Sequence, residues 1–488
     1  MLQQYKKINN ITGWFVFAIA SIVYLSTIEP TVSFWDCGEF ISTSYKLEVG
    51  HPPGAPLFAL MSRFATLFSF GHKELAAKMI NSMSALMSGL TILFLFWTIT
   101  HIARRIVLKT AKEIQKEHYF IIMGSGIIGA LAYAFTDTFW FSAVEAEVYA
   151  SSSFFTAIVF WTILKWEDEA DEPGANRWII LSAYLMGLSI GVHLLNILTI
   201  PALVFVYYFK KYTPSRNGFL ITLLISMIIT AGVLWGIIPY FFKIAFQFEL
   251  IFTNGFGLPF NTGAIVYFLL VVGLIIFGLY YSHKKSKALL NTIVLGVTVI
   301  LIGYSSYFTI IIRSLANPPL DENNPENVFN LVSFLNRDQY GDTPLLFGQS
   351  FNAPLDSREP YVKDKQWYIQ KNGKYVVVDE IQKPQYDERF TGFLPRMWSP
   401  DPRHIAAYKQ WTNMVGVPVM VTNPDGTTET IYKPTFMENM KFLFKYQMGH
   451  MFWRYFMWNF VGRQNDIQGH GELTNGNWIS GIPFIDNA

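Results

Sequence analysis

Charged residues and cysteine are both scarce in this chain of 488 residues. Only 15% of the residues are charged, whereas 51% are hydrophobic and 17% are aromatic. A soluble globular domain has roughly 25% charged residues, so a long chain with this composition indicates a polytopic membrane protein. The single cysteine, Cys37, cannot form an intramolecular disulfide, which excludes a disulfide framework.

An excess of positive charge is also missing. The chain has 37 Lys and Arg against 35 Asp and Glu, a formal net charge of +2. A nucleic-acid partner would require a basic face or stripe, so this class of partner is excluded. The sequence contains no glycine-rich phosphate loop and no Cys/His spacing typical of a metal site, so no motif assigns a cofactor or a metal ligand, and a divalent cation held by carboxylates is left open.

Long apolar runs, in contrast, are abundant before residue 313. Crossing a hydrocarbon core of about 30 Å takes roughly 20 helical residues. Nine runs of this kind are bounded by charged or turn residues: 12–29, 76–100, 119–136, 148–166, 177–193, 196–209, 218–238, 263–282 and 288–312. We therefore predict an all-α polytopic membrane domain over residues 1–312, with about nine transmembrane helices.

The distribution of Lys and Arg predicts the orientation of these helices. Basic residues gather in the loops 104–116, 210–216 and 284–287, whereas the loop 137–147 has none and the loop 239–262 has only Lys243. Because basic residues stay on the cytoplasmic side of a membrane, the N-terminus is predicted to be cytoplasmic. An odd number of spans then places the chain after residue 312 outside the cytoplasm.

Residues 313–488 differ in composition from the membrane domain. The pairs Asn-Gly at 372–373 and Asp-Gly at 425–426 lie between apolar segments, a pattern that predicts β-hairpins and hence an extracytoplasmic mixed α/β region. Residues 440–462 are aromatic and apolar but are interrupted by Lys, His and Arg. This composition favours a helix on the membrane surface over a tenth span.

The first external loop, residues 31–75, contains the most informative polar residues. Asp36 and Glu39 are three residues apart, so a helix would present both carboxylates on one face. A carboxylate at a low-dielectric boundary is a better proton acceptor, which suits a general base. The alternative is a pair of loop carboxylates bonded to backbone amides. His51, followed by Pro-Pro-Gly-Ala-Pro, either lines a cavity or marks a rigid corner.

The second external loop contributes Glu145 and Glu147, with Tyr149 beside them. The loop has no basic residue to pair with these acids, so they are costly at a membrane unless another element or a cation meets them. We expect them to face the same cavity. Solvation of the helix end is the alternative.

Four further polar residues are candidates for contact with a phosphate or sugar. His193 and Asn196 fall at the turn of a short hairpin of helices, where a structural role is the alternative. Arg63 and Arg313 are the basic residues nearest the external face that could pair with a phosphate. Their alternative role is that of snorkelling anchors.

Four segments, TVSFWDCGEF, HPPGAPLF, EAEVYA and GVHLLN, resemble a bacterial family of polytopic membrane proteins that is common in Bacteroidota. That family has the GT-C fold of glycosyltransferases that use lipid-linked sugars, and its eukaryotic relatives include a transmembrane protein O-mannosyltransferase. The resemblance covers residues 1–312, and the segment MWNFVGRQNDIQG near the C-terminus is also similar. By position, Asp36 corresponds to the essential acid of the first external loop and Glu39 to its neighbour. The spacing does not distinguish which of the two is the base, and Asp36 is favoured.

The resemblance implies a glycosyltransferase of the bacterial inner membrane with its active site in the periplasm. Its expected partners are a polyprenyl-phosphate-linked sugar, an exported acceptor protein with Ser or Thr hydroxyls, and the lipid bilayer. Phosphate is a good leaving group, so one general base would suffice for an inverting displacement. The phosphate would meet some of His51, Arg63, His193 and Arg313, or a divalent cation on the unpaired acids.

Two other classes of function compete with this interpretation. A transporter or flippase usually has internal repeats and ionisable sites near the bilayer midplane, neither of which is visible in this sequence. A non-catalytic membrane subunit of a secretion or assembly complex could use the aromatic residues at 440–462 for docking.

Overall fold

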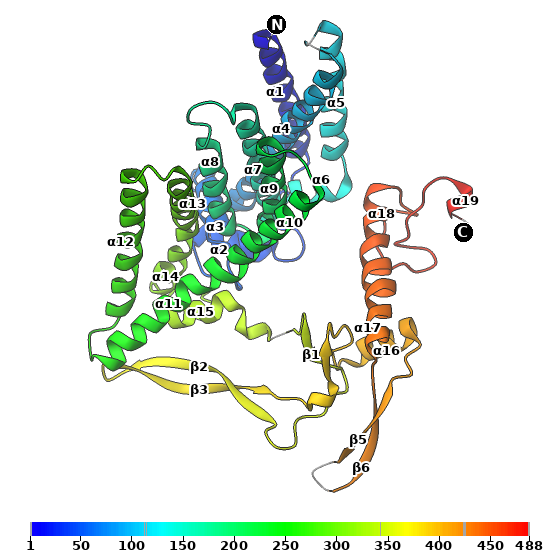
Figure 1. Ribbon diagram of the computed structural model, residues 1–488. Coiled ribbons are helices and arrows are strands. Elements are labelled where there is room, and N and C mark those ends of the chain that lie inside the picture. Colours follow the sequence, from blue (N-terminus) through cyan, green and yellow to red (C-terminus); the bar gives the residue numbers. More distant parts are fainter. Residues whose placement is uncertain (1, 112, 114, 342, 423–425, 487–488) are drawn as a thin grey trace. The chain divides into compact units, whose positions relative to one another are not determined.

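The computed structural model describes residues 2–111, 113, 115–341, 343–422 and 426–486. The chain forms two compact units (Figure 1). Unit 1 comprises Met1–Gln339 together with Gln370–Tyr375, and unit 2 comprises Tyr340–Ile369 and Val376–Ala488. Unit 1 is helical, and all six named strands except the ends of two lie in unit 2.

Unit 1 consists of helices joined mostly by short turns. In chain order they are α1 (Leu2–Ser26), α2 (Cys37–Lys46), α3 (Pro56–Thr66), α4 (Ala76–Thr110), α5 (Lys116–Ala134), α6 (Asp137–Ala143), α7 (Val148–Glu169), α8 (Arg177–Ile190), α9 (Ile200–Lys211), α10 (Arg216–Ala231), α11 (Ile238–Leu250), α12 (Thr262–Lys284), α13 (Ala288–Tyr304), α14 (Phe308–Ser314) and α15 (Val328–Asn336). Helix α15 packs against α11, which extends the unit beyond residue 312.

Seven helical segments among the described residues are long and apolar enough to cross a membrane, which indicates a multi-pass membrane protein. They are Gln3–Ser26, Lys73–Lys109, Val148–Glu169, Leu194–Lys211, Arg216–Gly255, Thr262–Lys284 and Ala288–Ser314. Helices α5 and α6, bent by 70°, would make an eighth span. Helix α8 has 14 residues and is therefore only about 21 Å long, shorter than the hydrocarbon core of about 30 Å. The nine predicted spans are thus not confirmed.

The interpretation of residues 239–262 as a loop is wrong for most of this segment. A π-helical turn, Gly232–Ile237, joins α10 to α11, and helical structure continues without a break from Arg216 to Gly255. The chain turns only after that point, where the buried carboxylate of Glu249 accepts hydrogen bonds from the backbone N–H groups of Asn261 (2.6 Å) and Ala264 (3.1 Å). Glu249 thereby satisfies amide donors at the first turn of α12.

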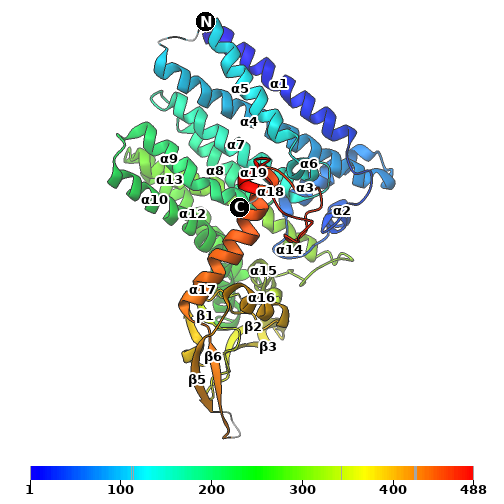
Figure 2. The same ribbon diagram turned by 90° about the vertical axis from the view of Figure 1, so that its right-hand side faces the viewer.

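Helices α1, α4, α5 and α7 run side by side (Figures 1 and 2). Helices α8 and α13 approach one another closely at their backbones. A Cβ atom on Gly187 would lie 2.5 Å from the carbonyl oxygen of Ile300, and one on Gly303 would lie 2.5 Å from the carbonyl carbon of Gly187. Only glycine permits this contact, as at many helix crossings in membranes.

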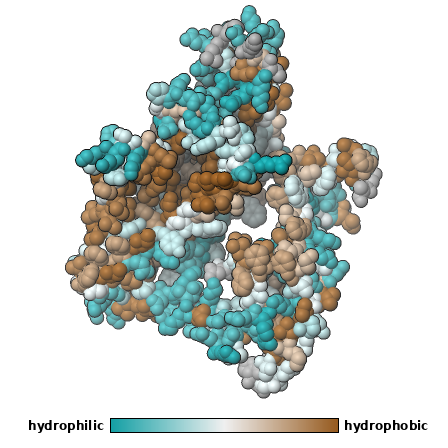
Figure 3. Space-filling view, in the orientation of Figure 1, coloured by the Kyte–Doolittle hydropathy of each residue, from teal (hydrophilic) through white to brown (hydrophobic). Residues whose placement is uncertain are grey.

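The two ends of unit 1 differ in charge. At the end that holds the N-terminus, Arg104 pairs with Asp168 (2.6 Å) and Lys211 pairs with Asp171 (2.9 Å), so two of the three basic loops meet at one acidic turn. In the view of Figure 3, hydrophilic side chains cover this end, whereas apolar side chains gather over α10 and α12. The segment 27–75 lies at the opposite end. This separation matches the predicted topology, while the side that faces the cytoplasm stays a prediction.

Unit 2 contains three two-stranded pairings, β1 (Phe347–Gln349) with β4 (Thr391–Phe393), β2 (Tyr361–Lys371) with β3 (Lys374–Pro384), and β5 (Val417–Thr422) with β6 (Thr428–Lys433). Both predicted hairpins are therefore confirmed. Asn372 (φ 51°) and Gly373 (φ 75°) supply the positive φ angles that a two-residue turn requires. The second turn, at 423–425, lies outside the described residues.

The helical elements of unit 2 follow the strands or lie between them. They are α16 (Pro402–Thr412), α17 (Phe436–Phe442), a π-helical segment (Leu443–Trp453), α18 (Arg454–Phe460) and the short α19 (Pro483–Asp486). Residues 436–460 are continuously helical but are not among the candidate spans. Their predicted position on the membrane surface stays a prediction.

Candidate active site in the segment between α1 and α4

Helix α2 presents the first two candidate carboxylates, and two arginines hold its other end. Asp36 is the residue immediately before α2. At the far end, Arg63 donates to the carbonyl oxygen of Tyr45 (2.7 Å) and Arg313 donates to that of Leu47 (2.6 Å). Guanidinium groups at a helix C-terminus satisfy free carbonyl groups and complement the helix dipole. Arg63 and Arg313, the two arginines predicted to contact a phosphate, therefore each have a structural partner.

Glu39, on the first turn of α2, is held by His51. Its Oε1 atom accepts hydrogen bonds from the backbone N–H of His51 (2.6 Å) and from the ring Nδ1 of the same residue (3.0 Å). The hydrogen bond from His51 lowers the pKa of Glu39, and the same hydrogen bond raises the pKa of His51. Gly50 leaves room for this contact, because a Cβ atom at this position would press on the Glu39 carboxylate. Glu39 thus fixes the turn that follows α2.

Asp36 differs from Glu39 in having no partner. Its side chain is exposed and makes no hydrogen bond or ion pair with any described residue. The residues before it are also exposed, Phe34 by 76% and Trp35 by 86%, and Trp35 has a φ of +60°. An exposed carboxylate without a partner is able to accept a proton from an incoming group.

Glu145 and Glu147 are buried between α6 and α7. Glu145 accepts hydrogen bonds from Ser33 Oγ (2.7 Å) and Cys37 Sγ (3.7 Å), and burial raises its pKa. Glu147 caps α7 by accepting from the N–H of Val148 (3.2 Å), and burial raises its pKa to about 7, helped by the charge of Asp36. Burial and the neighbouring carboxylates raise the pKa of Cys37 to about 12, so this thiol stays protonated and donates.

Tyr149, His193 and Asn196 support the connection from α8 to α9. The rings of Tyr149 and His193 lie 5.5 Å apart. His193 Nδ1 accepts from the N–H of Leu195 (3.2 Å), which caps the 3-10 helix Leu194–Thr199, and burial lowers the pKa of His193. Asn196 is fully buried and donates to Ser189 Oγ (2.9 Å).

A cavity of about 190 Å³ opens beside α2. Of the ten predicted site residues it brings together Glu39, His51 and Arg313, which line its wall. The cavity is also lined by Glu48, a residue that the sequence interpretation missed. The side chain of Glu48 is only 6% exposed, and its Oε1 atom lies 3.6 Å from Lys46 Nζ. One carboxylate oxygen of Glu48 has no hydrogen-bond partner among the described residues. The position of Glu48 close to His51 in the same loop was the signal by which the sequence could have identified it.

The remaining seven predicted residues do not line this cavity, although several lie next to it. They are Asp36, Arg63, Glu145, Glu147, Tyr149, His193 and Asn196. The charge of Asp36 contributes to the raised pKa of both His51 and Glu147, so Asp36 lies near both side chains.

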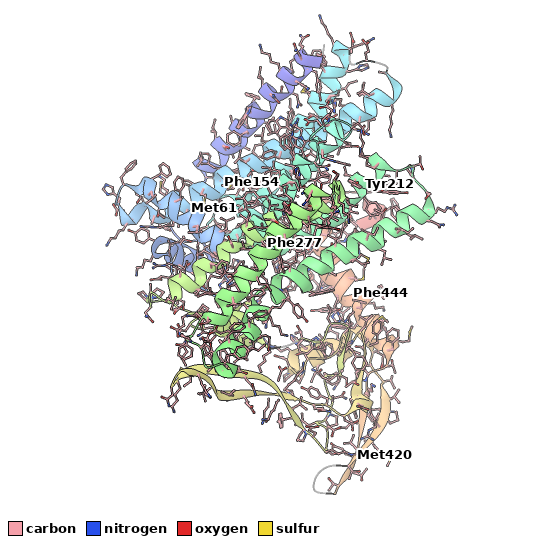
Figure 4. All side chains as sticks on the ribbon, turned by 60° about the vertical axis from the view of Figure 1, so that its left-hand side comes forward. Met61, Phe154, Tyr212, Phe277, Met420 and Phe444 are labelled. Carbon is pink, nitrogen blue, oxygen red and sulfur yellow. The ribbon has the colours of Figure 1, made fainter. Side chains whose placement is uncertain are left out.

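An apolar cluster packs among the helices that carry the candidate residues. Phe58 of α3, Val148 and Phe155 of α7 and Val192 are buried together. Met61 and Phe154, both labelled in Figure 4, pack against the same cluster. Such packing holds α2, α3 and α7 in a defined arrangement. Within the described part of the chain, no group of three or more His, Cys, Asp or Glu side chains is arranged to hold a metal ion.

The fold and site together define a multi-pass helical membrane protein with a cluster of carboxylates at one end of its helices. Residues 36–216 match a family model described as "Protein O-mannosyl-transferase TMEM260 N-terminal domain". Residues 341–444 match a second model, described as a family of unknown function (DUF8416). The first match begins at Asp36 and includes every predicted site residue except Arg313.

Two curated relatives carry the same name as the first family. The chain is 26% identical over 179 residues to "Protein O-mannosyl-transferase TMEM260" of Mus musculus, which is 36% of this chain and 22% of that protein. It is 23% identical over 146 residues to the protein of this name in Dictyostelium discoideum, 30% of this chain and 16% of that protein. The chain thus spans about a fifth of the length of the relatives it matches. No solved structure matches the chain significantly.

Proposed function

We propose that the protein is a membrane glycosyltransferase of the GT-C type that transfers a sugar, of the mannose class, from a polyprenyl-phosphate donor to Ser or Thr hydroxyls of exported proteins. The observation that carries this proposal is the similarity of residues 36–216 to protein O-mannosyl-transferases, because the matched segment contains the whole carboxylate cluster. A carboxylate at the membrane boundary is the group that such a reaction needs.

In the proposed reaction, Asp36 is the general base. Its carboxylate takes the proton of the acceptor hydroxyl while the hydroxyl oxygen forms a bond to the anomeric carbon of the donor. The bond from that carbon to the phosphate oxygen breaks, and the polyprenyl phosphate leaves with the bonding electrons. A single displacement of this kind inverts the anomeric configuration. Glu39 is unsuited to the role of base because its carboxylate is engaged by His51.

The donor phosphate would be met by Arg313 and His51, which both line the cavity beside α2. Arg313 uses Nε for the carbonyl of Leu47, and its planar guanidinium has further N–H groups for a phosphate oxygen. Attraction between His51 and Glu39 favours the protonated imidazole, a second cation at this wall. A divalent ion on the neighbouring acids is the alternative means of neutralising the phosphate.

The proposed location is a bacterial inner membrane, with the N-terminus in the cytoplasm and the site in the periplasm. Two observations support this orientation. Two of the three basic loops meet at the N-terminal end of unit 1, and the carboxylate cluster lies at the opposite end.

The test is a transfer assay in membranes that contain the full chain, supplied with polyprenyl-phosphate-linked sugars and Ser/Thr peptides and analysed by mass spectrometry. We expect Asp36→Asn to reduce turnover by roughly 10²- to 10⁴-fold, the usual contribution of a general base. Glu74→Gln is the matched control, since Glu74 is an exposed acid of the same segment outside the site.

Two results would contradict the proposal. If Asp36→Asn transferred sugar at the wild-type rate, Asp36 would not be the base. If the wild-type protein were inactive with every donor and co-purified with other membrane proteins, the non-catalytic subunit would be the better interpretation.

A further inference from the structure

A second and larger cavity lies at the opposite end of unit 1 from the candidate active site. Its volume is about 420 Å³, and its walls come from α1, α4, α7 and the first turns of α8. None of its lining residues belongs to the candidate active site or to the cavity beside α2. It lies among the residues of the basic end, where Arg104 and Asp168 are paired.

The lining of this cavity has an uncompensated positive charge. Arg104 donates two hydrogen bonds to Asp168 (2.6 and 2.7 Å), so these two charges neutralise one another. Lys6 and Lys165 also line the cavity, and neither ammonium group has an ion-pair partner within the part of the chain that the structure describes. Asp168 is the one carboxylate among the described lining residues and is paired with Arg104, so the two lysines leave an excess of positive charge that favours an anionic ligand.

The deeper wall of the cavity is aromatic. Four tryptophans line it, and their rings form a continuous row, with centroids 6.3 Å apart for Trp14 and Trp97, 5.5 Å for Trp97 and Trp161, and 5.9 Å for Trp161 and Trp178. Trp97 lies seven residues before Arg104 on α4, which at 1.5 Å per residue places it roughly 10 Å further along the helix. The row therefore begins beside the cations, where Lys165 Nζ lies 5.2 Å from the ring centroid of Trp161, and continues to Trp97 further along α4.

Two polar atoms of the lining residues lack partners as well. The indole N–H of Trp97 and the amide oxygen of Asn9 are buried and have no hydrogen-bond partner among the described residues. A buried donor without a partner is costly unless a ligand or water satisfies it.

We propose that this cavity binds an anionic lipid, with its phosphate group between Lys6 and Lys165 and the first carbons of its chains against the tryptophan row. The shared chemistry is a phosphate ester, which a soluble phosphate ester would also supply. A lipid is favoured because a soluble ester would leave the aromatic wall uncovered, whereas the apolar chains of a lipid would cover it. This site is independent of the proposed transferase reaction.

The test measures lipid binding to the purified full chain in a neutral detergent, by native mass spectrometry and by titration. The probes are phosphatidylglycerol, phosphatidylcholine and glycerol phosphate. The variant Lys6→Gln with Lys165→Gln removes both unpaired charges. Its matched control is Lys7→Gln with Lys109→Gln, which removes two exposed lysines from the same end of unit 1 without touching the cavity.

We expect the cavity variant to bind phosphatidylglycerol roughly 30-fold more weakly than the wild type, since each lysine near a membrane surface contributes about fivefold to anionic lipid binding. The control variant should bind within about twofold of the wild type, and both variants should unfold at the wild-type temperature.

Three results would overturn the proposal. Equal loss of binding in both variants would show that only the net charge of this end matters. Equal binding of phosphatidylcholine and phosphatidylglycerol would exclude the two lysines as the phosphate site. Equal affinity for glycerol phosphate and phosphatidylglycerol would support a phosphate site but refute a lipid as its ligand.

Discussion

The contact between Glu39 and His51 leads to a quantitative prediction for Glu39→Gln. Hydrogen bonds to a charged group contribute about 1.5–3 kcal/mol, and those between neutral groups about 0.5–1.5 kcal/mol. Glutamine retains the shape of the side chain and one acceptor oxygen, but it removes the charge from two hydrogen bonds. Both side chains are less than a third exposed. We therefore expect Glu39→Gln to lower the free energy of unfolding by roughly 2 kcal/mol at its maximum.

The size of this effect depends on pH in a defined way. The pKa of Glu39 is lowered, so its contribution is present above the ordinary value of 4.5 and is lost as the pH falls through the lowered pKa. The pKa of His51 is raised, so its contribution is present below the ordinary value of 6.5 and is lost as the pH rises through the raised pKa. The difference between wild type and variant should be largest between these two ordinary values.

The assay is thermal unfolding of the purified protein in detergent, followed by tryptophan fluorescence from pH 4 to pH 9. For a unit of this size, about 2 kcal/mol corresponds to a decrease of a few degrees in Tm. Asp36→Asn serves as the control, because Asp36 has no partner and its replacement should change stability by less than about 0.5 kcal/mol. The reasoning is refuted if Glu39→Gln has the same Tm as the wild type at every pH. It is also refuted if Asp36→Asn lowers Tm as much as Glu39→Gln does.

Two further predictions concern helix packing and the buried acids. Gly303→Ala should destabilise the protein by about 1–3 kcal/mol because its Cβ atom meets the α8 backbone. Gly296→Ala, on the same helix with open space around it, should leave Tm unchanged, and equal effects would refute the tight crossing. Glu147 has a pKa raised to about 7, so its stabilising contribution is lost as the pH rises from its ordinary value of 4.5 through 7. Glu147→Gln should therefore gain stability over the wild type across this interval, and a constant difference in Tm would contradict the raised pKa.

The membrane helices and the hairpins were predictable because their signals are local. A run of about 20 apolar residues and an Asn-Gly pair each determine structure within a few residues. The helical continuation through 239–255 was missed because the predicted span was ended at residue 238. Pro239 follows directly on the π-helical turn Gly232–Ile237, and the real turn depends on Glu249 and its contact with Asn261.

The shared position of Asp36 and Glu39 at the start of a helix was predictable, but the partners of the candidate residues were not, and the roles of these residues stay predictions. The spacing of Asp36 and Glu39 placed both at the start of one helix, as expected for residues three apart. The contact of Ser33 with Glu145 joins residues 112 positions apart, and helix packing alone brings them together. No pattern within either loop encodes that distance, so the assignment of partners required the structure.

The different surroundings of the four carboxylates make the site compatible with an anionic donor. Four ionised acids near one phosphate would repel it strongly at the low dielectric of a membrane boundary. Burial keeps Glu145 and Glu147 protonated to a higher pH than an exposed carboxyl group, and His51 compensates the charge of Glu39. Asp36 is then the one carboxylate of the four that is both exposed and uncompensated. A site arranged in this way can present a single base to an acceptor hydroxyl while still admitting a phosphate group beside it.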